Sequence, residues 1–400
     1  MSFDNKNKVF ILAGEASGDF IGSYIMKGLK VIDESTFFFG VGGSLMLKEG
    51  LSCHYNINEF NVIGFLNSIK NYRKLKNYVD EITQLILIEK PKVIITIDTK
   101  GFSYVLAKNI RSSFKLTGFK CPLIHFVPPT IWAYGKSRAK KWKNLHDGLF
   151  CMFKKEEQIF DKLDIQCNYL GNPLIEKVLK TRDYKSIKIN KKIKQNSKNF
   201  KCLLLPGSRD SEIKYILPVY ISLIKNHKFN QKVEWIIPTT KLHFDEVTKK
   251  IKNLSCKSII NVVVLEENYE LLKSADIAIA CSGTITLELV LLRIPTIAVY
   301  KTDILSAFLG KLMVNFKNVI LPNFLLGEPS IPFLFQGNCT SYNIEKVFNE
   351  YINDIQNQKS LFNIYANKII KSMNYENDTK LNFLNNSSAK IMKIIKNFNY

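Results

Sequence analysis

The sequence lacks the features that mark several common classes of protein. No stretch of about 18 or more residues is both apolar and free of charge, so a membrane-spanning helix is not expected. The apolar run Val9–Gly14 is too short for a secretory signal and is followed by Glu15 and Asp19. The motifs G-x-G-x-x-G and G-x-x-x-x-G-K-[ST] are absent, which counts against a dinucleotide oxidoreductase and excludes a P-loop ATPase.

Metal-ligand and disulfide patterns are also missing. The eight cysteines are scattered with no C-x-x-C pair, and the five histidines show no ligand spacing. We therefore expect a reduced cytoplasmic protein with no bound metal and no cofactor. A chain of 400 residues with 46% hydrophobic content is long enough for two to three folded domains and too apolar to be disordered.

Acidic residues and arginines are scarce beside lysine. Lys and Arg total 57 against 35 Asp and Glu, which gives a formal charge of +22, yet only six of the basic residues are arginines. The excess has two readings: a lysine-biased composition that fills solvated faces, or an anionic partner such as a membrane surface or a phosphorylated substrate. Nucleic-acid binding is not expected, because the sequence has no helix-turn-helix signature, RNP motif or basic stripe interleaved with aromatics.

What the sequence does contain is two series of short apolar runs that alternate with helical patterns. The predicted strands are Val9–Ala13, Phe37–Phe39, Val93–Ile97, Leu123–Val127, Gly148–Phe153 and Asn168–Leu170, then Cys202–Leu205, Trp235–Ile237, Val262–Val264, Ile277–Ala280 and Thr296–Val299. Such runs indicate parallel sheets that are covered on both faces. We predict an α/β protein with two Rossmann-like doubly wound domains, residues 1–176 and 200–341, joined by a basic linker at 177–199 and followed by a helical tail at 342–400.

Polar motifs follow the predicted strands, where open α/β sheets bind ligands. The segment Gly14-Glu-Ala-Ser-Gly-Asp19 is either an anion-binding turn or an ordinary strand-to-helix turn in which Asp19 caps a helix that runs to about Lys30. Asp98, at the end of a buried strand, is a candidate general base or a turn residue. Trp132 lies in a Pro-Pro loop and forms either a substrate wall or the packing under that loop.

The second series carries the stronger signals. Arg209, in Leu205-Pro-Gly-Ser-Arg209, offers a fork that suits diphosphate oxygens. Ser282, Gly283 and Thr284 open a helix whose N–H groups suit an anion, with a buried helix start as the other reading. Glu288, one turn further on, is a candidate for ribose hydroxyls. Asn323 and Gln336 are weaker candidates for hydrogen bonds to a ligand.

Taken together, these motifs resemble the lipid-A-disaccharide synthase family, which has the two-domain GT-B fold. The matching segments are Ala13-Gly-Glu-Ala-Ser-Gly-Asp19, Gly40-Val-Gly-Gly43, Val62-Ile-Gly-Phe65, Ile97-Asp98, Pro128-Pro-Thr-Ile-Trp-Ala133, Gly171-Asn-Pro-Leu174, Leu204-Leu-Pro-Gly-Ser-Arg209, Ser282-Gly-Thr-Ile-Thr-Leu-Glu288, Tyr300-Lys301, Leu321-Pro-Asn323 and Gln336. They follow the family's order over roughly residues 8–337. The sequence departs from the family pattern at Asn67, Asn172 and Phe333, and in Thr99-Lys-Gly-Phe-Ser103 after Asp98.

The resemblance implies an inverting, metal-independent glycosyltransferase of lipid A biosynthesis. Such an enzyme transfers 2,3-diacylglucosamine from its UDP derivative to 2,3-diacylglucosamine 1-phosphate and releases UDP. Asp98 would act as the base. Arg209, Ser282, Gly283, Thr284, Glu288, Asn323 and Gln336 would bind the UDP donor, and Gly14, Glu15, Ser17, Gly18, Asp19 and Trp132 would line the acceptor side of a cleft between facing domains.

Substrates with acyl chains imply a peripheral enzyme on the cytoplasmic face of the inner membrane. Phe65, Leu66 and Ile69, with cations nearby, suit an interfacial helix or, equally, a core-facing one; residues Ile304–Leu326 are a second candidate. Alternatives are another GT-B enzyme that uses a UDP-sugar (a MurG-like transferase or a UDP-N-acetylglucosamine 2-epimerase) and a non-catalytic basic protein bound to membranes or nucleic acid.

Overall fold

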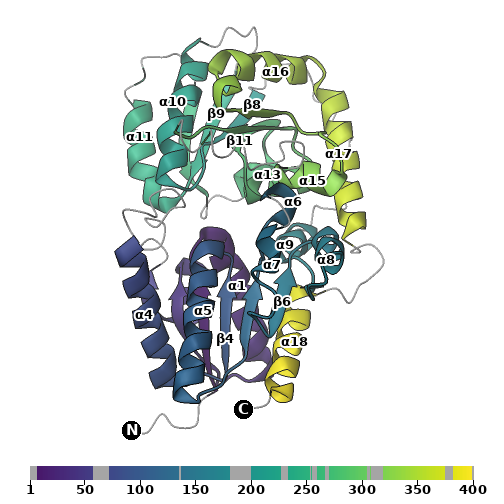
Figure 1. The fold of residues 1–400 in the computed structure, drawn as a ribbon. Helices are drawn as coiled ribbons and strands as arrows, with labels where there is room; N and C mark the ends of the chain where they lie inside the picture. Colours follow the sequence, from purple (N-terminus) through teal and green to yellow (C-terminus); the bar gives the residue numbers. More distant parts are fainter. Residues whose placement is uncertain are drawn as a thin grey trace. The chain divides into compact units, whose positions relative to one another are not determined.

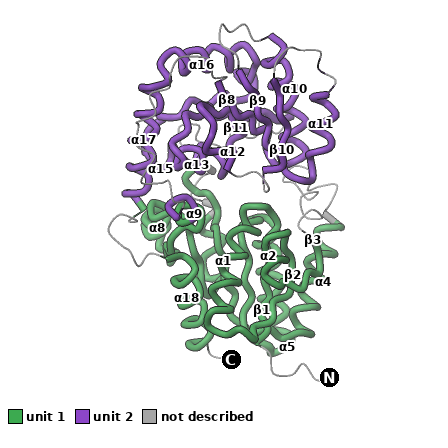
Figure 2. The backbone as a smooth tube through the Cα atoms, turned by 180° about the vertical axis from the view of Figure 1, so that it is seen from behind, with its two compact units in different colours: residues 1–176, 373–400 green, residues 177–372 purple. Residues whose placement is uncertain are grey.

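The structure is a computed structural model of the 400-residue chain. It describes residues 7–56, 72–134, 137–180, 200–226, 233–252, 254, 259–265, 270–303, 307, 319–373 and 382–398. The chain divides into unit 1, made of Met1–Glu176 and Met373–Tyr400, and unit 2, made of Lys177–Ser372 (Figure 2).

Unit 1 is built on a parallel sheet of seven strands in the order β3-β2-β1-β4-β5-β6-β7. The strands are β1 (Lys8–Ala13), β2 (Phe37–Gly42), β3 (Ser52–Asn56), β4 (Val93–Ile97), β5 (Leu123–Phe126), β6 (Gly148–Cys151) and β7 (Asn168–Tyr169). The central strands β4 and β5 are buried along their whole length because helices cover both of their faces. The strand order reverses between β1 and β4, whose pairing runs from Val9 opposite Val93 to Ala13 opposite Ile97.

Helices α4 (Tyr72–Glu89) and α5 (Lys100–Thr117) cover one face of this sheet, and α1 (Ala16–Ile32) and α18 (Phe383–Asn397) the other (Figure 1). Helix α18 approaches α1 so closely that a Cβ on Gly28 would meet the Leu384 carbonyl oxygen at 2.5 Å. The shorter helices are α2 (Ser44–Lys48), α6 (Ile131–Tyr134), α7 (Ser137–Lys140), α8 (Lys154–Asp161) and α9 (Pro173–Lys180).

Unit 2 repeats the plan with six parallel strands in the order β10-β9-β8-β11-β12-β13. They are β8 (Phe200–Leu205), β9 (Val233–Thr239), β10 (Ile259–Val264), β11 (Ile277–Cys281), β12 (Thr296–Tyr300) and β13 (Phe333–Phe335). The helices are α10 (Asp210–Asn226), α11 (Phe244–Lys252), α12 (Glu270–Lys273), α13 (Thr284–Leu291), α15 (Leu321–Leu326), α16 (Ser341–Asn353) and α17 (Ile355–Ser372), with 3-10 turns η1 (Lys241–His243) and η3 (Gln336–Asn338). The order reverses between β8 and β11, so each unit has one switch point.

The predicted fold class, two Rossmann-like α/β domains with helices at the end of the chain, is confirmed. Several details differ. Helix α1 begins at Ala16 rather than Asp19, and β3 and β13 were not predicted. The tail is not one body, because α16 and α17 belong to unit 2 whereas α18 belongs to unit 1. Of the expected linker, 177–180 ends α9 and 181–199 lies outside the described residues.

Candidate functional site

The carboxyl ends of β1 and β4 bring two predicted motifs together in unit 1. Gly14 follows β1, and its N–H donates a hydrogen bond to Thr99 Oγ1 at 3.0 Å. A Cβ at position 14 would stand 2.5 Å from the same oxygen, so the approach requires glycine. Gly14 therefore lies beside the segment that contains Asp98, at the edge where parallel α/β sheets form a ligand crevice.

Asp98 is held on a strained turn. Its φ is +53° and that of Thr99 is +45°, a left-handed conformation that is costly for a β-branched residue. The strain is offset by hydrogen bonds: the Asp98 N–H donates to the Phe126 carbonyl at 2.9 Å, and Ser103 Oγ donates to the Asp98 carbonyl at 3.0 Å. Strain of this kind is common at active sites, where a fixed geometry is needed.

A lysine lies beside the Asp98 carboxylate. Lys100 Nζ is 3.1 Å from Asp98 Oδ1, and the Asp98 side chain is 17% exposed. Burial opposes the charge on Lys100, but the nearby carboxylates of Asp98, Glu15 and Glu156 outweigh it and raise the Lys100 pKa. Glu15, predicted for the acceptor side, thus acts electrostatically on the lysine that pairs with the candidate base.

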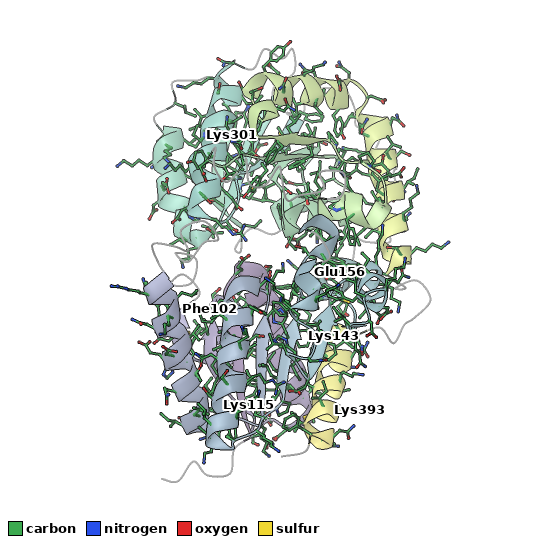
Figure 3. The ribbon with its side chains drawn as sticks, in the orientation of Figure 1. Phe102, Lys115, Lys143, Glu156, Lys301 and Lys393 are labelled. Carbon is green, nitrogen blue, oxygen red and sulfur yellow. The ribbon has the colours of Figure 1, made fainter. Side chains whose placement is uncertain are left out.

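Glu156 is a further candidate site residue, which the sequence analysis did not predict. It lies in the first turn of α8, is buried, and its Oε1 accepts a hydrogen bond from Trp132 Nε1 at 3.0 Å. Burial raises the pKa of Glu156 to about 7, although the Trp132 bond and the Lys100 charge act in the opposite direction. Figure 3 places Glu156 at the same end of unit 1 as Phe102, near the start of α5, and away from Lys115. A glutamate in the first helical turn after a predicted strand was the available signal.

Asp19 and Gly18 have structural roles in unit 1. The Asp19 carboxylate is buried and accepts hydrogen bonds from the backbone N–H groups of Gly43, Leu45 and Met46 at 2.8, 2.9 and 3.0 Å. Asp19 therefore caps α2 from within α1, and it does not cap its own helix as one reading of the sequence had it. A Cβ on Gly18 would lie 3.3 Å from the Ala13 Cβ, so Gly18 lets α1 pack against the sheet, and Ser17 is half-buried beside it.

At the switch point of unit 2, the loop after β8 folds over a buried glutamate. Glu212 Oε2 accepts the N–H groups of Ser208 at 2.8 Å and Arg209 at 3.3 Å, and Glu212 Oε1 lies 3.3 Å from Arg209 Nη1. Gly207 has a φ of +114°, and a Cβ there would stand 2.3 Å from Glu212 Oε2. The N-terminus of α10 is thus occupied by this carboxylate, and the Arg209 side chain, 48% exposed, extends to solvent.

The N-terminus of α13 lies across the same switch point. Gly283 and Thr284 are exposed, no side chain caps the helix, and a Cβ on Gly283 would meet no atom within 4 Å. Below them, the buried Tyr220 hydroxyl donates toward the carbonyls of Leu205 at 3.2 Å and Ile279 at 3.1 Å, which ties β8 to β11. Ser282, Gly283, Thr284 and Arg209 therefore share one edge of the sheet, as the strand order requires.

The remaining donor candidates are engaged within unit 2. Glu288 Oε1 pairs with Lys177 Nζ at 3.2 Å. The Asn323 carboxamide bridges the backbone of Ile331, with bonds of 3.0 and 2.8 Å, and the Gln336 carboxamide bridges that of Thr302 in the same way, at 3.1 and 2.8 Å. Each amide thus joins two segments of unit 2 by hydrogen bonds. The contacts of Asn323 and Gln336 with UDP stay predictions.

Other predicted features have no site in the described structure. Phe65, Leu66, Ile69 and Asn67, and most of Ile304–Leu326, lie outside the described residues. Within the described ranges, no helix is both long and apolar enough to cross a membrane, and no group of three acidic, histidine or cysteine side chains could hold a metal ion.

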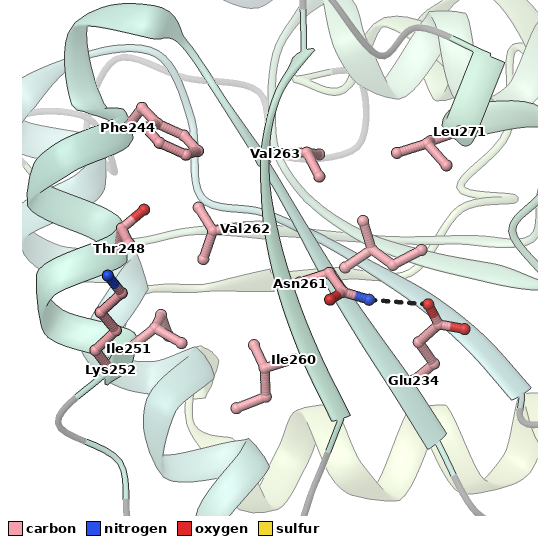
Figure 4. A pocket seen from close by; sticks show the side chains of 11 residues that line it. Glu234, Phe244, Thr248, Ile251, Lys252, Ile260, Asn261, Val262, Val263 and Leu271 are labelled. Carbon is pink, nitrogen blue, oxygen red and sulfur yellow. Dashed lines mark hydrogen bonds between the residues drawn. The ribbon is translucent and has the colours of Figure 1, made fainter.

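A cavity of about 390 Å³ lies between α11 and the outer strands β9 and β10, away from the switch point (Figure 4). Its lining is mainly apolar, with Asn261 Nδ2 donating to Glu234 Oε1 at 3.0 Å. None of the predicted site residues lines it.

Comparison with known proteins decides the family. The model of the lipid-A-disaccharide synthetase family matches residues 9–385. The chain belongs to the lipid-A-disaccharide synthetase family. It is 30% identical over 389 residues to the lipid-A-disaccharide synthase of Rickettsia prowazekii (96% of this chain, 98% of the relative) and 32% identical over 360 residues to that of Wigglesworthia glossinidia brevipalpis (89% and 91%).

Solved structures support the fold of this lipid-A-disaccharide synthetase family member. The S. aureus MnaA–UDP co-structure aligns with a TM-score of 0.60 at 14% identity, covering 98% of this chain and 96% of that one. MurG from Acinetobacter baumannii aligns with a TM-score of 0.55 at 11% identity, covering 98% and 100%. At such identities the likeness shows the GT-B fold alone.

Proposed function

We propose that the chain transfers 2,3-diacylglucosamine from its UDP derivative to the 6-hydroxyl of 2,3-diacylglucosamine 1-phosphate, which gives a β-1,6-linked disaccharide 1-phosphate and UDP. The proposal rests on one observation: in each unit, motifs shared with the family lie at the switch point of the sheet. Gly14 and Asp98 meet at the β1–β4 switch of unit 1, and Arg209 and Ser282–Thr284 at the β8–β11 switch of unit 2.

The N-termini of α10 and α13, which lie at the switch point of unit 2, suggest how the diphosphate binds. Glu212 already fills the N-terminus of α10, whereas the N-terminus of α13 is exposed and uncapped. We therefore assign the diphosphate to the N–H groups of Gly283 and Thr284, with the Arg209 guanidinium as its fixed cation. Both groups would stabilise the negative charge that develops on the departing UDP.

Asp98 is the proposed general base. In the transfer, the acceptor 6-hydroxyl loses its proton to Asp98 while its oxygen attacks the anomeric carbon. The bond from that carbon to the diphosphate breaks, and its electron pair leaves with UDP. The anomeric centre inverts through a transition state with oxocarbenium character. Trp132, oriented by Glu156, would form part of the acceptor wall.

Membrane association is a further part of the proposal. Both substrates carry acyl chains, so we place the enzyme at the cytoplasmic face of the inner membrane, with Phe65, Leu66 and Ile69 as contacts. Flotation of the Phe65→Glu and Leu66→Glu variants with anionic liposomes tests this. Weaker flotation than wild type is expected, and unchanged flotation would remove this segment from the proposal.

Incubation with both substrates tests the activity itself. We expect disaccharide 1-phosphate and UDP in equal amounts, which mass spectrometry and chromatography measure directly. If the chain were a UDP-N-acetylglucosamine epimerase or a MurG-like transferase, no such product would form. If it were a non-catalytic membrane-binding protein, calorimetry would also detect no UDP binding.

A further inference from the structure

Lys100 lies at a helix position that is unfavourable for a positive charge. It is the first residue of α5, and the first turn of that helix contains no acidic residue. A cation at a helix N-terminus meets the positive end of the helix dipole, which is unfavourable. The position of Lys100 therefore needs a cause outside its own helix.

That cause lies among the side chains around it. Lys100 Nζ is 3.1 Å from Asp98 Oδ1, and the charges of Glu15 and Glu156 act on the same ammonium. These carboxylates keep Lys100 charged although burial opposes the charge. His125, on the neighbouring strand, adds no competing positive charge, because burial lowers its pKa to about 3.

We propose that Lys100 is a positioning residue for the base Asp98, an inference that rests on the proposed function. The strained turn at Asp98 and Thr99 fixes the backbone but leaves the carboxylate free to rotate. The ion pair at Oδ1 removes that freedom and directs the other oxygen, Oδ2, toward the acceptor hydroxyl. The proton passes from the hydroxyl to Oδ2, and Lys100 keeps its own proton throughout.

Lys100 also balances the charge of the crevice. Without the ammonium, the carboxyl groups of Asp98, Glu15 and Glu156 would lose the positive charge of Lys100 that acts on them. Lys100 therefore compensates the negative charge of the crevice and also directs the base.

Three variants test this role. Lys100→Met removes the charge at nearly equal length, Lys100→Arg keeps it, and Lys108→Met is the matched control, because Lys108 lies on the same helix with its ammonium 5.7 Å from the Tyr104 ring. We expect Lys100→Met to lower kcat by about 10- to 100-fold with little change in KM for either substrate. Lys100→Arg should recover kcat to within about fivefold of wild type, and Lys108→Met should match wild type.

A second measurement separates positioning from direct contact with substrate. In an Asp98→Asn background, Lys100→Met should cause no further loss of kcat, since Lys100 acts through Asp98. Wild-type kcat in Lys100→Met, a rise in acceptor KM in place of the fall in kcat, or full additivity with Asp98→Asn would each overturn the inference. Failure of the proposed function looks different: the wild-type enzyme itself would form no disaccharide.

Discussion

Glu156 should make the free energy of unfolding of unit 1 depend on pH, and the substitution Glu156→Gln should remove this dependence. Burial raises its pKa to about 7, whereas an unfolded glutamate titrates near 4.5. The folded state thus binds the proton more tightly. The contribution of Glu156 to the free energy of unfolding is therefore greatest below about pH 4.5 and is lost as the pH rises through about 7. A difference of about 2.5 pKa units corresponds to about 3 kcal/mol in the free energy of unfolding.

Glu156→Gln keeps an acceptor for Trp132 Nε1 and has no proton to lose. Between pH 5 and 8 we expect wild type to lose about 2.5 kcal/mol of stability relative to this variant. Urea titrations followed by tryptophan fluorescence measure it in a Trp235→Phe background, where the two remaining tryptophans, Trp132 and Trp142, both report on unit 1. Parallel pH profiles for the two proteins would refute the reasoning.

Two further substitutions probe the frameworks of the two switch points. Asp19→Ala leaves three backbone N–H groups at the start of α2, two of them buried, without their acceptor, so urea titration should show unit 1 less stable by about 3 kcal/mol. The UDP affinity of unit 2 should be unchanged by calorimetry, and wild-type stability would contradict the capping role. Gly207→Ala forces a Cβ onto the Glu212 carboxylate, so the UDP Kd should rise by at least about tenfold, and an unchanged Kd would show that the loop after β8 does not bind the diphosphate.

The strand-end motifs were predictable because local sequence and sheet topology act together. Strand β4 has the predicted bounds Val93–Ile97, and the residues directly after it are those that the fold brings beside Gly14. Strands β3 and β13 were missed for physical reasons. Ser52–Asn56 is largely polar and lies at the edge of its sheet, and Phe333–Phe335 spans only three residues.

Contacts between residues far apart in the chain could not be predicted from the sequence. An amphipathic pattern predicts that α18 buries one face but does not say which unit it covers, and the close approach at Gly28 that answers this joins residues far apart in the chain. The bond from Trp132 to Glu156 arises in the same way, because it joins the segments that follow the adjacent parallel strands β5 and β6. The ion pair of Lys100 and Asp98, in contrast, joins residues only two positions apart on one turn. Asp19 reads locally as a cap for its own helix, and only the fold shows that it caps α2.

The transfer rates of wild type and Asp98→Asn, with both lipid substrates present, test the central claim most directly. Asp98→Asn keeps the shape of the side chain, and we expect it to bind UDP normally and to retain the unfolding profile of wild type. Its rate of disaccharide formation should fall by at least about 100-fold, because the acceptor hydroxyl has no base. A variant that forms disaccharide at close to the wild-type rate would contradict the assignment of Asp98 and the mechanism built on it.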